Sequence, residues 1–182
     1  MTDNTSWETI DNDTIDRGFA DEIVKSGVDR IRTCIQCGTC TSVCPSGRHT
    51  AFKTRELMRK AVLGLKDEVL SSQDLWLCST CYTCLERCPR QIRITDAIIS
   101  MRNMAVDHGF MLPEHKKASQ KLLSTGHAVP IDGANQELRK DLGLPELPPT
   151  THSNKKALKQ VQEILKRTGF KDLVESQKLE GK

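Results

Sequence analysis

The sequence predicts a mainly α-helical fold, and two observations carry this prediction. Apolar residues recur at helical spacing in several segments, of which residues 54–65 and 95–105 are the clearest. No segment shows the alternation of apolar and polar residues that predicts a half-buried strand. Two copies of one cysteine pattern separate the predicted helices, and the rest of the chain is organised around them.

Both copies have the spacing C-x2-C-x2-C-x3-C-P, and together they use all eight cysteines of the chain. The first comprises Cys34, Cys37, Cys40 and Cys44; the second comprises Cys78, Cys81, Cys84 and Cys88. This is the ligand pattern of a two-cluster ferredoxin, in which the fourth cysteine binds the other cluster. Three thiolates on a tight loop can occupy three corners of one cubane, and the cysteine before proline points away from its own loop. We therefore expect one [4Fe-4S] cluster on Cys34, Cys37, Cys40 and Cys88, and a second on Cys78, Cys81, Cys84 and Cys44.

Other uses of eight cysteines fit the pattern less well. Two structural zinc sites could each use four thiolates, but zinc ribbons pair two C-x2-C knuckles across a long loop. A disulfide framework would suit a small secreted domain, and the first residues of this chain, Met1 to Glu8, have no basic or apolar signal segment. We expect a cytoplasmic protein, and no apolar run approaches the roughly 20 residues that cross a bilayer.

Composition and charge agree with an iron–sulfur protein and exclude a nucleic-acid binder. Hydrophobic residues make up 37% of the chain and aromatic residues only 4%, so the clusters would supply part of the cohesion of the core. Residues 30–107 contain 12 Lys and Arg against 7 Asp and Glu. Two clusters of about −2 each would offset that excess, because buried charge must be paired. The arginines expected to compensate the clusters are Arg30, Arg32, Arg48, Arg87, Arg90 and Arg93.

Cap residues and apolar spacing predict the helices of the first part of the chain. In order, we expect a helix over 16–26, a helix capped by Thr54 and reaching Leu65, a short helix capped by Ser71 or Ser72, and a helix capped by Thr95 and ending near Gly109.

The later part of the chain has a different composition. We expect a helix from Pro113 to Gly126, a short helix over 134–142, an extended segment over 144–149, and a last helix from Ser153 or Asn154 to Gly169. That last helix is amphipathic, and could fold back on the core or dock on another protein. We divide the chain into a flexible arm (1–15), a ferredoxin domain (16–112) and a helical, Pro-rich extension that contacts a partner (113–182).

The 33 residues between the cysteine runs, 45–77, contain the predicted helices rather than strands, so this part resembles the alpha-helical ferredoxin domain of respiratory iron–sulfur subunits. A narrower resemblance covers roughly residues 16–145. The stretch from Arg55 to Leu70, the segment Leu75-Trp-Leu-Cys-Ser-Thr-Cys-Tyr-Thr-Cys, and the segment Thr125-Gly-His-Ala-Val-Pro-Ile-Asp closely resemble the C subunit of heterodisulfide reductase from methanogenic archaea.

The resemblance implies an electron-relay subunit without a substrate site or catalytic residues of its own. Its partners would be the A subunit, which holds FAD, and the B subunit, which reduces the coenzyme M–coenzyme B heterodisulfide through non-cubane clusters. A hydrogenase or formate dehydrogenase would supply electrons to the wider complex. The alternative is an iron–sulfur subunit of another flavoprotein oxidoreductase, of the glycolate-oxidase or fumarate-reductase type.

Overall fold

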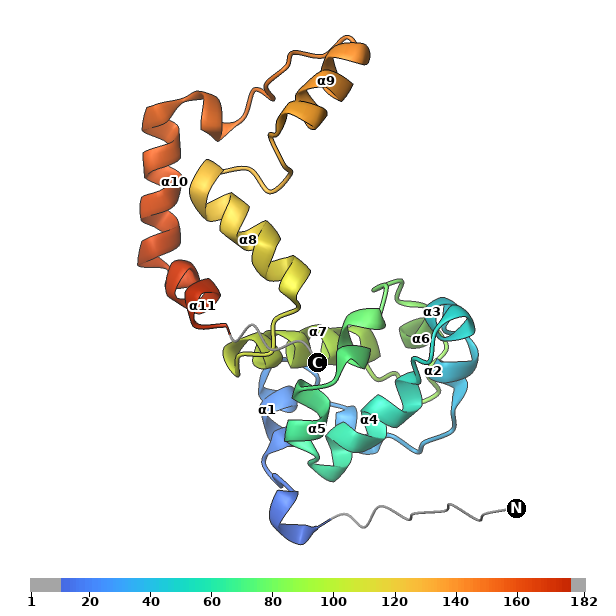
Figure 1. Ribbon diagram of the computed structural model, residues 1–182. Helices are drawn as coiled ribbons and strands as arrows, with labels where there is room; N and C mark the ends of the chain where they lie inside the picture. The colour runs from blue at the N-terminus through green and yellow to red at the C-terminus, as the bar shows by residue number, and fades with distance from the viewer. Residues whose placement is uncertain (1–10, 178–182) are drawn as a thin grey trace, which may run out of the picture. The chain divides into compact units, whose positions relative to one another are not determined.

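The computed structural model describes residues 11–177, and all regular secondary structure in that part of the chain is helical (Figure 1). The predicted mainly α fold is therefore confirmed. The chain forms two compact units, divided between His108 and Gly109. The predicted flexible arm falls mostly on residues 1–10, outside the described part. Residues 12–14 form a short 3-10 helix.

Seven α-helices form the first unit between residues 11 and 108. They are α1 (Phe19–Lys25), α2 (Thr39–Ser42), α3 (Pro45–His49), α4 (Thr54–Leu63), α5 (Lys66–Leu70), α6 (Thr83–Glu86) and α7 (Ile94–Asp107). The described part of this unit also has three 3-10 helices: η1 (Asn12–Thr14) before α1, η2 (Ile31–Thr33) between α1 and α2, and η3 (Gln73–Leu77) between α5 and α6.

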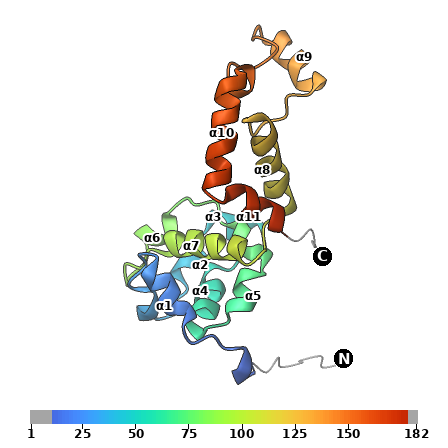
Figure 2. The same ribbon diagram turned by 90° about the vertical axis from the view of Figure 1, so that its left-hand side faces the viewer.

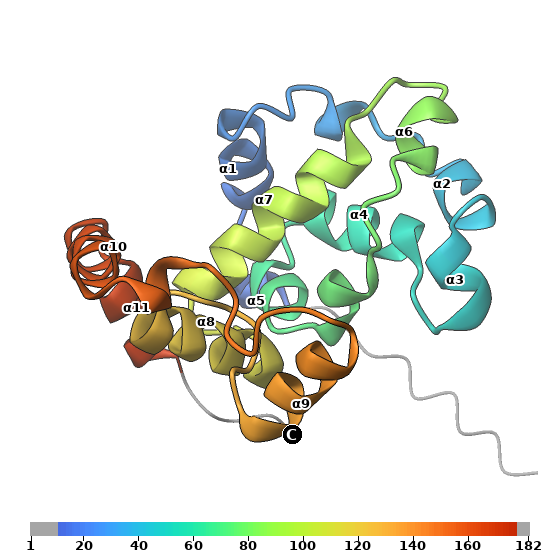
Figure 3. The ribbon, with the colours of Figure 1, turned by 90° about the horizontal axis from the view of Figure 1, so that it is seen from above.

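Helix α7 runs through the middle of the first unit and contacts α1, α5, α6 and η3 (Figure 3). Its buried side chains include Ile94, Ile98, Met101 and Ala105, which recur every three or four residues on one face. Side chains of α1 and α4 complete the core with Phe19, Ile23, Leu57 and Met58. The core therefore lies directly beneath the two cysteine runs.

The third cysteine of each run lies in a helix of only four residues, Cys40 in α2 and Cys84 in α6. These two helices contact each other, and they also contact α4 and α7 respectively. The long helices α4 and α7 thus position the two cysteine loops next to one another.

The second unit contains α8 (Pro113–Thr125), α9 (Gly133–Asp141), η4 (Thr151–Ser153), α10 (Lys155–Arg167) and α11 (Phe170–Ser176). Helices α8 and α10 lie side by side (Figure 2), and the side-chain amide of Gln162 donates to the carbonyl of Leu123 over 3.1 Å. Helix α10 is the predicted amphipathic last helix, for which the sequence analysis left open whether it folds back on its own chain or docks on another protein. In the structure it packs against α8 of its own unit. The Asn154 cap is confirmed, because its side chain accepts from two backbone N–H groups.

Several predicted boundaries were wrong by a few residues. Lys53 and Arg93 occupy the cap positions predicted for Thr54 and Thr95, and both threonines are buried in the first turn of their helices. The helix predicted to reach Leu65 ends before Gly64, whose φ of 82° breaks it. The first predicted helix begins at Phe19 rather than at residue 16.

Five α-helices were missed: α2, α3, α5, α6 and α11. Each spans only four to seven residues, too few to show an apolar period. By contrast, the Pro113 start and the Ser72 cap are confirmed, and the Ser72 hydroxyl accepts from the N–H of Asp74 at 3.1 Å.

Candidate metal centres

The two cysteine runs have the same local backbone. In each run the residue after the second cysteine is left-handed, with φ of 85° at Gly38 and 61° at Tyr82. A four-residue helix follows at once, and it carries the third cysteine. The repeated spacing in the sequence therefore encodes a repeated loop.

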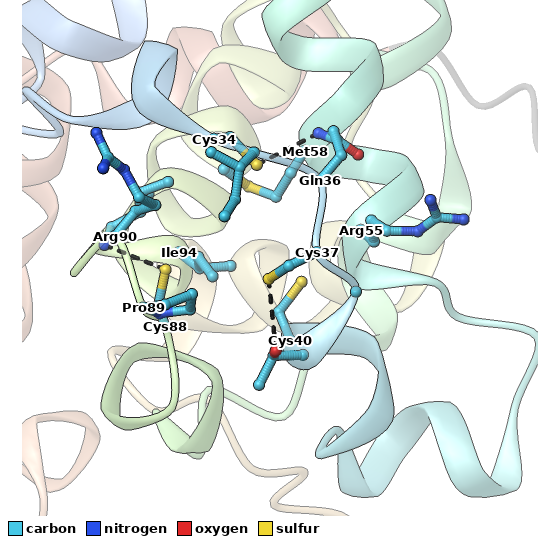
Figure 4. Close-up of a pocket in the computed structure, with 14 residues that line it drawn as sticks. Cys34, Gln36, Cys37, Cys40, Arg55, Met58, Cys88, Pro89, Arg90 and Ile94 are labelled. Atoms are coloured by element: carbon cyan, nitrogen blue, oxygen red, sulfur yellow. Dashed lines mark hydrogen bonds between the residues drawn. The ribbon is translucent and has the colours of Figure 1, made fainter.

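One cavity is lined by Cys34, Cys37 and Cys40 of the first run together with Cys88 of the second (Figure 4). The four side chains surround a common space, although Cys88 is separated from the others by more than forty positions in the sequence. Met58 and Ile94, from α4 and α7, form part of its wall. These are the four cysteines that the sequence assigns to the first cluster.

The remaining cysteines are also close to one another. Burial raises the pKa of the Cys78 thiol, and the nearby sulfurs of Cys44 and Cys81 raise it further. The pKa of Cys84 is raised in the same way, by burial and then by Cys78 and Cys81. Cys44 and Cys84 are each only 8% exposed. The structure thus brings Cys44, from the first run, to the cysteines of the second.

The two groups adjoin each other at Cys40 and Cys84. Burial raises the pKa of Cys40 to about 11, with further contributions from Cys84 and from Cys34. A buried thiol of this kind stays protonated until a metal displaces the proton. Electrostatic coupling between Cys40 and Cys84 means that charge placed in one group is felt in the other.

The second cysteine of each run is the exposed one, and a threonine hydroxyl lies beside it. The Sγ of Cys37 is 3.4 Å from Oγ1 of Thr39, and the Sγ of Cys81 is 3.4 Å from Oγ1 of Thr83. These hydroxyls, with the backbone N–H groups of the same threonines, lower the pKa of Cys37 and of Cys81. The hydroxyl must donate once the sulfur is a thiolate, because a thiolate has no proton to give.

The fourth cysteine of each run accepts a backbone N–H from a residue that follows it. Gly47 donates to Cys44, and Ile92 donates to Cys88, both over 3.4 Å. A Cβ at Gly47 would lie 2.8 Å from the carbonyl oxygen of Phe52, so only glycine fits there without a shift. This close approach fixes the direction of the Cys44 side chain.

Other side chains also lie within hydrogen-bond distance of cysteine sulfurs. The amide of Gln36 donates to Cys34 over 3.3 Å, and the hydroxyl of Thr95 lies 3.5 Å from the sulfur of Cys84. Thr95 was predicted to be a helix cap, and it instead faces a cysteine from the first turn of α7. Donors to thiolate sulfur are typical of iron–sulfur sites, where they stabilise the added charge of the reduced cluster.

The arginines are arranged differently from the sequence-based expectation. Arg32 and Arg93 pair with the carboxylates of Asp21 and Asp96, each at 2.6 Å. Arg90 lines the cavity, but its guanidinium points away from the sulfurs in Figure 4. Arg102, which the sequence analysis did not select, is the arginine whose charge lowers the pKa of Cys78.

Arg102 also connects α7 to the second cysteine run. Its Nε donates to the carbonyl of Leu75 over 2.7 Å, and its terminal nitrogen donates to the carbonyl of Cys78 over 2.5 Å. The guanidinium carbon lies 5.7 Å from the centre of the Trp76 ring. A sequence signal for Arg102 was weak, because nothing in helical spacing distinguishes it from a surface arginine. The contacts of the Thr39 and Thr83 hydroxyls with sulfur were not predicted, although both runs read Cys-x-Thr-Cys and this repeat is a signal in the sequence.

The residues present fit iron–sulfur clusters. The eight thiols form two groups of four, and thiolate sulfur is a soft ligand suited to iron–sulfur clusters. Hydrogen-bonding groups lie beside sulfurs of both groups. Within residues 11–177, no three His, Cys, Asp or Glu side chains converge on a point as the ligands of one metal ion would. In a cubane, each thiolate binds a different iron atom.

Comparison with known proteins agrees with this geometry. Residues 30–92 match the 4Fe-4S dicluster domain family. The C subunit of the H(2):CoB-CoM heterodisulfide,ferredoxin reductase of Methanothermobacter marburgensis is 51% identical over 160 residues, which cover 88% of this chain and 86% of that protein.

Two further relatives carry related names. The iron-sulfur C subunit of the CoB--CoM heterodisulfide reductase of Methanopyrus kandleri is 50% identical, over 79% of this chain and 75% of that protein. The C subunit of the ferredoxin/F(420)H(2)-dependent CoB-CoM heterodisulfide reductase of Methanosarcina acetivorans is 46% identical, over 86% of this chain and 98% of that protein.

The fold and the two cysteine groups define a helical, ferredoxin-type protein that binds two [4Fe-4S] clusters. Within that class, the chain belongs to the family of the heterodisulfide reductase C subunit, the iron–sulfur subunit of an oxidoreductase complex of methanogenesis. Among the helices of residues 11–177, none has the length and apolar character needed to span a membrane.

Proposed function

We propose that this chain relays electrons, in the cytoplasm, from the flavin-containing A subunit to the catalytic B subunit of heterodisulfide reductase, which reduces the coenzyme M–coenzyme B heterodisulfide. A hydrogenase or a formate dehydrogenase feeds the wider complex. The name of the Methanothermobacter marburgensis relative includes H(2), which supports hydrogen as the donor.

We propose Cys34, Cys37, Cys40 and Cys88 as ligands of the first cluster, and Cys78, Cys81, Cys84 and Cys44 as ligands of the second. The observation that carries the proposal is the cavity shared by three cysteines of the first run and Cys88 of the second. The electrostatic effect of Cys44 on Cys78 supports the reciprocal arrangement.

Each cluster supplies a one-electron redox centre when bound. The chain itself contributes three things: thiolates that hold each cluster, donors that stabilise charge on the sulfurs, and an apolar core that limits water. The contact between α2 and α6 keeps the two cysteine groups adjacent, which favours transfer between them. Neither group needs a bound substrate for this role.

We also propose that residues 16–112 act as the ferredoxin domain and residues 113–182 as an extension that contacts a partner. Exposed apolar side chains of the second unit support a contact surface, because Val129 is 57% exposed and Leu142 is 67% exposed.

The relay is tested in the purified complex with Cys37→Ala and Cys81→Ala variants of this chain. The donor should still reduce the flavin of the A subunit at an unchanged rate, whereas reduction of the heterodisulfide should fall to background. Size-exclusion chromatography checks that the complex stays assembled. A variant that lacks one cluster, retains the intact complex and still reduces the heterodisulfide at the wild-type rate would refute the relay.

A further inference from the structure

The residue after the second cysteine of each run is held in a left-handed conformation, yet the two runs place different residues there. The first run has Gly38 and the second has Tyr82. Gln36 and Thr80, two positions earlier, also share a positive φ, of 56° and 53°. The loop therefore imposes left-handed backbone at both positions in both runs.

Glycine adopts this conformation without steric cost, whereas a tyrosine does not. Gly38 shows that glycine meets the requirement of the loop. A Cβ at Gly38 would meet only the Arg55 side chain, at an ordinary contact distance of 3.7 Å, so crowding does not explain the difference. The second run thus keeps a strained residue where an unstrained one would serve the backbone, and such strain is found where a side chain has a function.

The side chain of Tyr82 connects its loop to α7. Its hydroxyl donates to Oδ1 of Asp96 over 3.2 Å, and Oδ2 of Asp96 accepts from Nε of Arg93 over 2.6 Å. Asp96 follows Thr95, whose hydroxyl lies beside the sulfur of Cys84. Tyr82 itself lies between Cys81 and Cys84 in a Cys-Tyr-Thr-Cys segment. The hydrogen bond from Tyr82 to Asp96 therefore attaches the loop that carries Cys81 and Cys84 to α7.

The first loop has no bond from this position, because Gly38 has no side chain, and it is held instead through Thr41, whose hydroxyl accepts from the backbone N–H of Arg55 over 2.8 Å. Cys37 and Cys81 are both exposed, so the two loops differ in their attachment rather than in the exposure of this ligand. A hydrogen bond that attaches a loop to a helix makes opening of that loop less frequent, and opening gives water and other reagents access to the metal.

We propose that Tyr82 is a positioning residue that tethers the second cysteine loop to α7 and so limits the access of water and chelators to the second cluster. This inference rests on the proposed ligand assignment. It predicts that loss of the Tyr82–Asp96 hydrogen bond speeds iron loss from the second cluster and raises the potential of that cluster, while the first cluster is unaffected. Water stabilises the more negatively charged reduced cluster, so a looser loop raises the potential.

The experiment measures iron release to bathophenanthroline from the reconstituted full chain under anaerobic conditions. Cys81→Ala removes a proposed ligand of the second cluster and identifies which kinetic phase belongs to that cluster. Tyr82→Phe should speed that phase about five-fold, the factor expected for one net hydrogen bond. Tyr82→Gly should speed it at least as much and raise the potential of the same cluster, while the melting temperature does not fall, because the left-handed strain is removed.

Phe110→Ala is the control, since Phe110 is an aromatic residue of the second unit and is 42% exposed, close to the 40% of Tyr82. It should change neither phase. Wild-type release kinetics in both Tyr82 variants, or faster loss from the first cluster instead, would overturn the tether. These measurements need no partner protein and no heterodisulfide, so a failure of the relay itself would leave their result unchanged.

Discussion

The guanidinium of Arg102 donates a hydrogen bond to the backbone carbonyl of Cys78, which lies 24 residues earlier in the chain. The same group donates to the carbonyl of Leu75 and so holds both ends of the turn that delivers Cys78. Its positive charge favours the thiolate of Cys78 over the thiol. One side chain of α7 therefore both positions a proposed ligand and adds positive charge beside it.

Replacing Arg102 with glutamine should make the second cluster harder to reduce. Loss of a nearby positive charge costs the reduced state on the order of 1 kcal/mol, or roughly 40 mV for a one-electron couple. A redox titration followed by EPR measures the potential of each cluster. Arg102→Lys should recover part of the shift, because it restores the charge without the fork of donors.

The control for Arg102 is Arg32→Gln, since Arg32 pairs with Asp21 at the surface. It should leave both potentials unchanged. An equal shift of the two clusters in Arg102→Gln would contradict a local effect on Cys78.

Gly47→Ala should damage the second cluster through Cys44. The added methyl group would lie 2.8 Å from the carbonyl of Phe52, so the turn that directs Cys44 must shift. We expect destabilisation of about 1–3 kcal/mol and reduced iron content. Gly133→Ala is the matched control, because its Cβ would meet nothing within 4 Å. Full iron content in Gly47→Ala would show that the turn can accommodate the methyl group.

Thr39→Val and Thr83→Val form a matched pair of substitutions in the two loops. Each removes a hydroxyl 3.4 Å from a cysteine sulfur without a large change in volume. We expect Thr39→Val to lower the potential of the first cluster, and Thr83→Val to lower that of the second, by roughly 40 mV, which corresponds to one net hydrogen bond. Redox titration of both variants tests this, and a shift in the opposite cluster would argue against the ligand assignment.

Lys66 should make the stability of the first unit depend on pH in the alkaline range. Its Nζ lies 2.8 Å from both carboxylate oxygens of Glu22, and this hydrogen bond raises the pKa of Lys66. Because the pKa of Lys66 is higher in the folded state, its ion pair contributes its full stabilisation at pH values below the unfolded pKa of about 10.4. The contribution is lost as pH rises through the pKa of the folded state.

Lys66→Met should lower the free energy of unfolding at about pH 8 by about 1 kcal/mol, because the partly exposed Glu22 is screened by solvent. It should also remove the decline in stability that begins as pH rises above the unfolded pKa of about 10.4. Lys117→Met, which breaks a largely exposed ion pair with Glu114, should change stability little. Denaturation of the anaerobic holoprotein at a series of pH values measures the free energy of unfolding of each variant. If stability of Lys66→Met still declines at alkaline pH as in the wild type, the decline belongs to another group.

The helical fold class and the two iron–sulfur clusters could be predicted from the sequence, because both depend on the local spacing of residues. Pro113, Ser72 and Asn154 fixed helix starts through backbone chemistry that operates within a few residues. The roles of Thr95 and Arg102 could not be predicted, because they depend on contacts with residues 11 and 24 positions away. Thr95 has the sequence context of a cap, and only tertiary packing turns its hydroxyl toward Cys84.

The most direct test of the proposed account compares Cys88→Ala with two reference variants, Cys37→Ala and Cys81→Ala, by EPR of the reduced holoprotein. Cys37→Ala defines the spectrum that remains without the first cluster, and Cys81→Ala defines the spectrum without the second. The crossed ligand assignment predicts that Cys88→Ala matches Cys37→Ala, although Cys88 belongs to the run that contains Cys81. A match to Cys81→Ala instead would mean that each run binds its own cluster, and would contradict the assignment.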